Sequence, residues 1–389
     1  MAAVHVLIVP DTFDDLGSPR AADALATGWQ EAAPHDRLAV LPASDGGAGF
    51  VGALARTLEG TLEAVATTDP LGREVPATVL LVAGESGPTA YVEAAQAGGV
   101  HLLSDSERDP GRTSSAGVGR LLLAALDLGA RHIVVGVGGL GTNDAGAGLL
   151  GVLGVGRGDR LQRGGAALAD LSLDDLRGLD AARHRFRDVD LVAATDVASP
   201  LLGLKGTSAV FAGRIGATEE QAQRLEACLG HFASLVARAH PPRRDLLSGE
   251  AIRPERAAGA GAGGGVGYAL HLLGARLVDG VGALLDAVGF DRLAAASDLV
   301  VTGCATFDWE SLQQSVPLGV SGRAQRLGVP TVLVARESVV SRREAMDAGL
   351  SGVYSLADAP RGLRTAADTP AVLGALAARV ARTWSPRRS

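Results

Sequence analysis

Cysteine, aromatic residues and long apolar runs are scarce in this chain of 389 residues. Its two cysteines, Cys228 and Cys304, are too few for a disulfide framework or a cysteine-rich metal site. Aromatic residues make up only 3% of a sequence that is 47% hydrophobic, so the core must be aliphatic. No apolar run is long enough to span a bilayer, and Met1 leads into a strand-like segment without the basic start of a signal peptide. We therefore expect a cytoplasmic protein with no membrane partner.

Positive charge is limited in amount and is carried almost entirely by arginine. Lys205 is the only lysine among 36 basic residues, which face 43 acidic residues and leave a net charge of -7. This balance gives no support for a nucleic-acid partner. Any phosphate chemistry must therefore depend on arginine, backbone N–H groups and a metal ion, with at most one lysine.

Glycine, by contrast, is abundant, with 53 residues that fall in clusters. The β-branched run Ile133–Val137 ends at Gly138 and Gly139, and an apolar helix start follows Asn143 and Asp144. A strand that stops at glycines and continues as a helix can bring backbone N–H groups close to an anion. The alternative is a tight turn without a ligand, because the segment fits neither the dinucleotide nor the P-loop pattern.

A second glycine cluster lies at Ala257–Leu270 and includes Gly263 and Gly264. It is too rich in glycine for an ordinary packed helix start. The cluster indicates either a helix N-terminus close to phosphate groups or a close contact between helices, and the sequence favours neither.

Acidic residues directly follow several predicted strands. Asp11, Asp45 and Asp196 each come just after a short β-rich run. Open α/β sheets bind ligands at the carboxyl ends of their strands, so these side chains are candidates for metal or substrate binding. For Asp45 the alternative is a helix N-cap. Glu93, which also follows a strand, is either a substrate contact or a helix cap.

Strand and helix patterns alternate at both ends of the chain, whereas residues 75–82 and 90–92 form a hairpin-like pattern between them. The simplest architecture is an α/β fold with two domains. A flavodoxin- or Rossmann-like, doubly wound domain would consist of residues 1–69 and 286–389, and residues 70–285 would form a second, inserted α/β domain. We expect the active site in the cleft between two such domains.

Motifs along almost the whole chain, in this order and spacing, resemble the glycerate kinase family of the bacterial two-domain type. The segments that carry the resemblance are Asp11–Phe13, Ser44–Gly47, Asp69–Arg73, Val92–Ala94, Arg108–Pro110, Gly138–Gly139, Thr142–Asp144, Ala194–Asp196, Gly216–Ala217, Gly259–Gly265, Thr302–Gly303 and Pro317–Val320. The resemblance implies a flavodoxin-like domain with an inserted α/β domain. It also implies ATP- and Mg²⁺-dependent phosphorylation of D-glycerate, or of a related small hydroxy acid, with 2-phosphoglycerate as the main product.

The same resemblance suggests which residues serve the reaction. Asp45 and Asp196 are the candidates for the base or for magnesium ligands, and Arg73 and Arg214 are the candidate cations at the phosphate. The other expected substrate or phosphate contacts are Asp11, Glu93, Gly138, Gly139, Asn143, Asp144, Gly263, Gly264 and Asp308. We expect a small-molecule substrate and either a monomer or a homodimer.

Five positions depart from the family pattern in their charge. Lysine is replaced at Asp14, Ile215 and Ser315, and glutamate is replaced at Ala48 and Cys304. We interpret Cys304 as a small buried residue rather than a reactive thiol. The alternative function is therefore that of a catalytically impaired relative, which binds a nucleotide or a small acid as a sensor or subunit.

Overall fold

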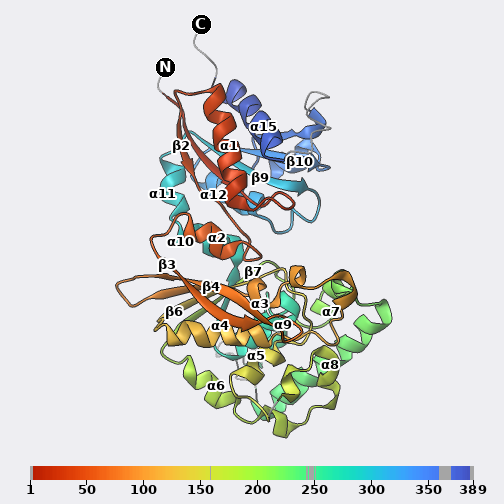
Figure 1. The fold of residues 1–389 in the computed structure, drawn as a ribbon. Coiled ribbons are helices and arrows are strands. Elements are labelled where there is room, and N and C mark those ends of the chain that lie inside the picture. The colour runs from red at the N-terminus through yellow and green to blue at the C-terminus, as the bar shows by residue number, and fades with distance from the viewer. Residues whose placement is uncertain are drawn as a thin grey trace. The chain divides into compact units, whose positions relative to one another are not determined.

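The computed structural model describes residues 3–157, 159–241, 244, 249, 251–358 and 369–385. The chain forms two compact units, each built around one β-sheet (Figure 1). The first unit consists of the residues up to Asp45, the segment Gly52–Leu58 and the residues from Val281 onward. The second unit consists of Gly46–Val51 and Glu59–Gly280.

The first unit contains a parallel sheet of five strands in the order β11-β10-β9-β1-β2. The strands are β1 (His5–Pro10), β2 (Arg37–Val40), β9 (Leu299–Phe307), β10 (Thr331–Ser338) and β11 (Gly352–Ser355). The helices that lie in this unit are α1 (Ser18–Ala32), α11 (Phe290–Ala295), α12 (Val316–Arg326), α13 (Arg342–Asp347) and α15 (Thr369–Trp384). The central strands β1, β9 and β10 are mostly buried, which explains their nearly continuous apolar runs, whereas the edge strands β2 and β11 are partly exposed.

Helices from opposite ends of the sequence close the core of the first unit. The red helix α1 lies beside the blue helix α15 in Figure 1, and the two helices pack along one face of the sheet. A Cβ on Gly28 of α1 would collide with the backbone carbonyl of Gly374 in α15, so glycine permits this close approach. Trp29 is fully buried there, and its indole N–H donates to the Asp36 carboxylate at 2.9 Å. The cluster is otherwise mainly aliphatic, as the composition predicts.

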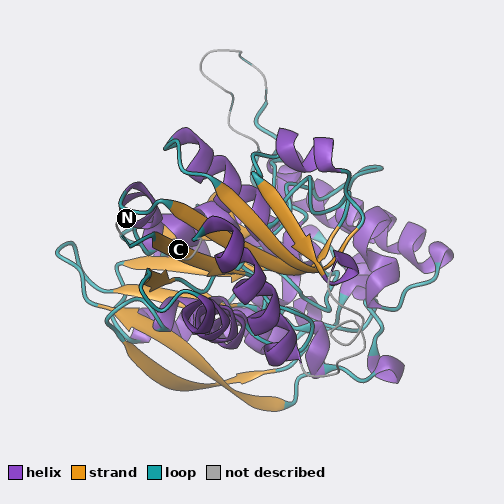
Figure 2. Ribbon diagram, turned by 90° about the horizontal axis from the view of Figure 1, so that it is seen from above, coloured by secondary structure: helices purple, strands orange, loops and turns teal. Residues whose placement is uncertain are grey.

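The second unit contains a mixed sheet of six strands in the order β3-β4-β5-β6-β7-β8. The strands are β3 (Thr61–Thr68), β4 (Glu74–Val82), β5 (Thr89–Glu93), β6 (His132–Val137), β7 (Asp190–Thr195) and β8 (Arg276–Asp279). The first three strands pair antiparallel, and β5 to β8 pair parallel. Figure 2 shows strands flanked by helices. The helices of this unit are α3 (Ala95–Gly98), α4 (Ala116–Asp127), α5 (Ala147–Val152), α6 (Leu179–Arg185), α7 (Thr207–Phe211), α8 (Glu219–Ala239) and α9 (Ala262–Leu272).

Two further helices include residues from both units, namely α2 (Phe50–Ala55) and α10 (Gly280–Ala287). The structure confirms the α/β class with two units, but it divides the chain at other positions than residues 69 and 285. The reason on the N-terminal side is β3, which the sequence analysis assigned to the first domain. This strand pairs with β4 from Thr61 to Thr68 and therefore belongs to the sheet of the second unit. Every helix in the described part of the chain is too short or too polar to cross a membrane.

Candidate active site

Two carboxylates lie near each other at the carboxyl-terminal edge of the first sheet. Asp11 follows β1, and its backbone N–H donates to the carbonyl of Gly303 on β9 at 2.8 Å. Asp45 follows the end of β2 after a short loop. Burial, followed by the charge of Asp45, raises the pKa of Asp11 from 3.8 to about 7, although Thr12 donates to its carboxylate. The shift therefore reflects repulsion between the two carboxylates in addition to burial.

Cys304 and Asp308 complete this edge of the first unit. Cys304 lies on β9 and is 7% exposed, and its thiol donates to the carbonyl of Thr306 at 3.3 Å. Burial, with smaller contributions from Asp11 and Asp308, raises the pKa of the thiol, so Cys304 is the buried residue that the sequence analysis expected. Asp308 accepts a hydrogen bond from the backbone N–H of Ser311 at 3.0 Å, which lowers its pKa and closes a local turn.

In the second unit, three segments crowd together at the carboxyl ends of β6 and β7. A Cβ on Gly138 would lie 2.8 Å from the Cα of Gly47 and 2.9 Å from Oδ2 of Asp196. A Cβ on Gly136 would lie 2.6 Å from the carbonyl oxygen of Gly46. Glycine at these positions therefore brings the loop after Asp45 and the Asp196 carboxylate onto the strand ends.

Gly139 differs from its neighbours, because a Cβ there would meet nothing within 4 Å. The residue is exposed and has a left-handed backbone, with a φ of 67°. The backbone beside the Asp196 carboxylate is therefore accessible at Gly139, and a ligand can approach it without displacing a side chain. This is the part of the glycine-rich loop that best fits the predicted anion contact.

Glu93 occupies the position of a cap. It lies at the end of β5 and is 6% exposed. Its carboxylate accepts hydrogen bonds from the backbone N–H groups of Gly49 and Val51, both at 3.0 Å, around the start of α2. Burial raises the pKa of Glu93, and the two backbone hydrogen bonds oppose this effect. Of the two roles left open by the sequence, the geometry supports the cap.

Asp144 holds the loop together. Its Oδ2 accepts hydrogen bonds from the backbone N–H and hydroxyl of Ser115, at 2.8 and 2.9 Å, and from the N–H of Gly148 at 3.2 Å. Its Oδ1 accepts from the N–H of Gly146 at 3.0 Å, and the residue is fully buried. These bonds connect the starts of α4 and α5, so they give Asp144 a structural role. The neighbouring Asn143 is also buried, and its side-chain amide donates to the hydroxyl of Ser208 at 3.0 Å.

The second glycine cluster is explained by close packing. Gly263, Gly264 and Gly265 have left-handed backbones, with φ values of 60°, 68° and 92°. A Cβ on Gly264 would collide with the carbonyl oxygen of Thr142, and one on Gly263 would lie 2.6 Å from Leu140. The backbone carbonyl of Gly264 also accepts from the N–H of Ala145 at 2.9 Å. The cluster therefore packs against the loop that contains Asn143, and a phosphate contact is not needed to account for it.

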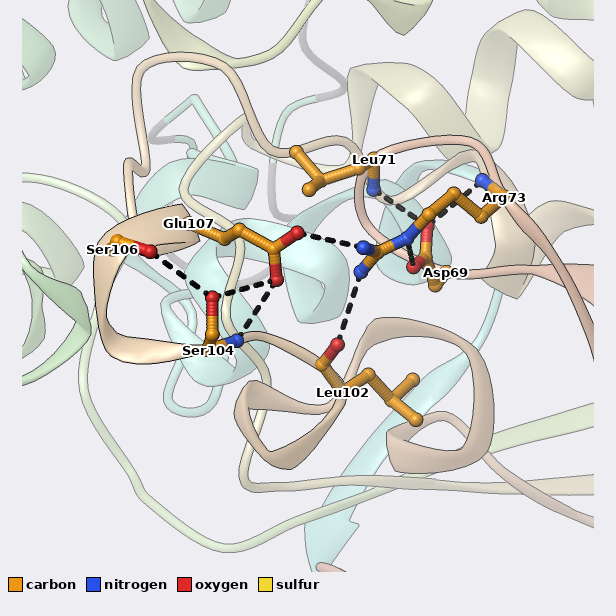
Figure 3. A network of polar contacts seen from close by, with 7 residues as sticks. All are labelled: Asp69, Leu71, Arg73, Leu102, Ser104, Ser106 and Glu107. Atoms are coloured by element: carbon orange, nitrogen blue, oxygen red, sulfur yellow. Dashed lines mark hydrogen bonds and ion pairs between the residues drawn. The ribbon is translucent and has the colours of Figure 1, made fainter.

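Arg73, one of the two predicted phosphate-binding cations, has protein acceptors on all sides of its guanidinium (Figure 3). Its Nε pairs with Asp69, its Nη1 with Glu107 at 2.7 Å, and its Nη2 with the carbonyl of Leu102 at 3.1 Å. These contacts join two loops of the second unit, so the observed role is structural. Arg214, the other candidate, lies 6.0 Å from the centre of the Phe211 ring, over its face.

A cation that the sequence analysis did not consider lies in the first unit. Arg336 is the first charged residue after the buried run of β10, and its Nη1 pairs with the carboxylate of Asp14. The position directly after a predicted strand is the signal that could have drawn attention to it. In the part of the chain that the structure describes, no group of three or more histidine, cysteine or acidic residues lies close enough to hold a metal.

The sequence and the fold are both similar to those of known glycerate kinases. The profile of the Glycerate kinase family matches residues 6–385. A glycerate kinase of Bacillus subtilis (strain 168) is 35% identical over 360 residues, which cover 91% of this chain and 90% of that protein. A glycerate 2-kinase of Escherichia coli (strain K12) is 33% identical over 376 residues, or 94% of each chain. The crystal structure of a protein assigned as glycerate kinase 2 from Salmonella typhimurium LT2 superposes with a TM-score of 0.76 at 34% identity, over 98% of both chains. The chain therefore belongs to the glycerate kinase family.

Proposed function

We propose that this protein transfers the terminal phosphoryl group of ATP to D-glycerate in the presence of Mg²⁺, with 2-phosphoglycerate as the main product. The observation that carries the proposal is the similarity to glycerate kinases over almost the full length of both chains. The strand-end carboxylates Asp11, Asp45 and Asp196 support it, because each follows a parallel strand, directly or after a short loop, at the edge where open α/β sheets bind ligands.

Phosphoryl transfer depends mainly on positioning and on charge neutralisation, with a group that accepts the proton of the attacking hydroxyl. Asp45 and Asp196 are the two candidates for that group. Asp196 lies against Gly138, so a hydroxyl that it oriented would also be close to the exposed glycine Gly139. Asp45 lies near Asp11, which places two carboxylates at one edge of the first sheet.

The donor set around Asp45 fits a magnesium ion. Mg²⁺ is usually held by one or two carboxylates together with phosphate oxygens and water, so a full cage of protein ligands is not required. Burial, and after it the charge of Asp45, raises the pKa of Asp11, and a divalent cation would relieve the repulsion between the two carboxylates. When bound, the ion would neutralise part of the negative charge of the phosphate groups. We propose Asp45 as a magnesium ligand of the first unit, and Asp196 is the candidate of the same kind in the second unit.

The loop from Gly138 to Asp144 would supply backbone donors to the substrate. In this proposal Gly139 presents its backbone to the ligand, whereas Asn143 and Asp144 keep the loop in position through buried hydrogen bonds. Glu93 has a comparable positioning role, because it fixes the segment that follows Asp45 and Gly46 in the chain.

The alternative is a catalytically impaired relative that binds a nucleotide or a small acid. The observation in its favour is the loss of charge at Ala48, Ile215, Cys304 and Ser315 and the reversal of charge at Asp14, relative to the family pattern. Arg336 pairs with Asp14, so positive charge is still present beside that position.

A coupled assay of ADP release, with D-glycerate, ATP and Mg²⁺, tests the proposal. We expect turnover well above a blank without enzyme, and a loss of about a hundredfold or more in kcat for Asp45→Asn or Asp196→Asn. Phosphorus NMR of the product distinguishes 2- from 3-phosphoglycerate. Turnover equal to the blank, together with stabilisation of the fold by ATP or glycerate in a thermal-unfolding experiment, would establish the binding protein instead.

A further inference from the structure

The family's reaction needs positive charge beside the transferred phosphoryl group, and in this chain almost all positive charge belongs to arginine. Lys205, the only lysine, is exposed on a loop of the second unit. The guanidinium of Arg73 is already occupied by Asp69, Glu107 and a backbone carbonyl. Asp11 and Asp45 lie near each other at the edge of the first sheet, so a positive side chain at that edge would be well placed to hold an anionic substrate.

Arg336 stands at that edge. Strand β9 lies between β1 and β10, with Pro10 and Val334 both in register with Gly303, and Ala335 in register with Cys304. Asp11 and Arg336 therefore follow the buried parts of two strands that are about 10 Å apart, which is twice the usual spacing between neighbouring strands. Arg336 is partly exposed, with 37% of its side-chain surface open to solvent.

Asp14 holds the guanidinium of Arg336 in place. The loop after β1 is closed by reciprocal backbone hydrogen bonds between Phe13 and Leu16, both at 2.9 Å, and both of these side chains are buried. Asp14 lies at the tip of this turn with a left-handed backbone, at a φ of 52°. Its carboxylate pairs with Nη1 of Arg336, so the ion pair links the loop after β1 to β10, on the other side of β9.

Fold stability alone is a weak reason for this pair. The two side chains are 37% and 47% exposed, and ion pairs in such positions contribute little because water screens them. A guanidinium has five N–H donors in a rigid fork, and within the described residues Arg336 uses one nitrogen, on Asp14. The remaining donors are free to bind a second oxyanion, a carboxylate or a phosphate, while Asp14 keeps its own contact.

We propose that Arg336 binds an oxyanion of a substrate, and that Asp14 is the positioning residue that orients its guanidinium. The inference rests on the proposed function, since both substrates of that reaction are anions. The oxyanion is either the carboxylate of glycerate or a phosphate of the nucleotide, because both present oxygens that match the guanidinium fork. In the family pattern a lysine stands where this chain has Asp14. Arg336 would supply the positive charge of that lysine.

The test compares Arg336→Ala with Arg56→Ala, which removes a matched surface arginine of the same unit. Arg56 is 53% exposed and pairs with Asp23 at 2.9 Å. We expect kcat/KM to fall at least about 30-fold for Arg336→Ala, to change less than about threefold for Arg56→Ala, and to recover partly in Arg336→Lys. Both alanine variants should unfold at nearly the same temperature.

Separate titrations of the two substrates identify the oxyanion. A rise in KM for glycerate alone assigns the carboxylate, whereas a rise in KM for ATP or a fall in kcat assigns a phosphate. Asp14→Asn should shift the same kinetic parameter in the same direction by a smaller factor, which a merely structural pair would not do. If Arg336→Ala equals Arg56→Ala in kcat and in both KM values, the inference is overturned.

Calorimetric binding separates this inference from the proposed function. If the natural chain shows no turnover, the proposed function fails, and binding of ATP with Mg²⁺ and of D-glycerate is then measured for each variant. A loss of affinity in Arg336→Ala that is absent in Arg56→Ala supports the oxyanion site. Equal affinities in the two variants, or no binding of either compound to the natural chain, overturn it.

Discussion

Gly138, at the end of β6, lies directly against the carboxylate of Asp196, at the end of β7. A Cβ on Gly138 would lie 2.9 Å from Oδ2 and 3.0 Å from Cγ of Asp196, and 2.8 Å from the Cα of Gly47. Two of these three atoms belong to a side chain proposed to serve the reaction. The glycine therefore determines how closely the glycine turn and the carboxylate approach each other.

Gly138→Ala should displace Asp196 and so impair the reaction. The added methyl group cannot be accommodated without movement of either the carboxylate or the backbone at Gly47. We expect kcat to fall by about ten- to a hundredfold, since small displacements of reacting groups have effects of that size. Overpacking should also lower the free energy of unfolding by about 1–3 kcal/mol. Steady-state kinetics and urea unfolding measure the two effects.

Gly230→Ala is the matched control for this variant. Gly230 lies within α8 of the same unit, and a Cβ there would meet nothing within 4 Å. Alanine should therefore stabilise the helix by up to about 1 kcal/mol and leave kcat unchanged. Full activity in Gly138→Ala would show that the position of Asp196 does not matter for turnover.

Asp144→Asn tests the structural role assigned to this buried carboxylate. An amide has one acceptor oxygen, so it cannot replace both carboxylate oxygens that bind Ser115, Gly146 and Gly148. We expect a loss of about 2–3 kcal/mol in the free energy of unfolding, because buried donors lose their partner. Asp188→Asn, at a side chain that is 70% exposed, should change stability by less than about 0.5 kcal/mol. Unchanged stability in Asp144→Asn would contradict this role and point back to a ligand contact.

Arg73→Ala should affect stability rather than catalysis. The guanidinium joins the turn at Asp69 to the segment of Glu107 (Figure 3), so its removal should lower the unfolding temperature. Because all three guanidinium nitrogens already have protein acceptors, we expect kcat/KM to stay within about threefold of the natural chain. A large loss of kcat/KM without a change in unfolding temperature would restore Arg73 as a phosphate ligand.

Local patterns predicted the elements well, because they depend on neighbours in the chain. The long helix α8 is an example, because Thr218 caps its start by accepting from the N–H of Gln221 and its own residues determine its period. The alternation of strands and helices at both chain ends correctly indicated one unit built from both, since buried parallel strands have continuous apolar runs. The position of β3 was not predictable in this way, because its partner strand depends on pairing and not on its own residues.

The roles of individual site residues were much harder to predict. Gly264 is a glycine because Thr142 lies against it, and the two residues are more than a hundred positions apart. Asp14 and Arg336, which pair across β9, are separated by 322 positions. A glycine turn or an acidic residue at a strand end has the same local pattern whether it packs against the protein or faces a ligand. Only the packing in three dimensions distinguishes a structural residue from a ligand-binding residue.

Glu93 should make the stability of the fold depend on pH in a direction opposite to that of a typical ion-paired carboxylate. Burial raises its pKa above the usual value of 4.5, so the folded chain keeps the proton more tightly than the unfolded chain. As the pH rises from 4.5 through the raised pKa, the unfolded chain ionises first, and the contribution of Glu93 to stability is lost over that interval.

Glu93→Gln cannot ionise, so the difference in unfolding free energy, natural chain minus variant, should decrease with rising pH and then level off. Urea unfolding of both proteins between about pH 4 and about pH 8 measures this difference, in which other buried acids such as Asp144 cancel because both proteins contain them. A difference that increases with pH would mean that the hydrogen bonds from Gly49 and Val51 outweigh burial, and that Glu93 is an ionised cap at every pH at which the protein is folded.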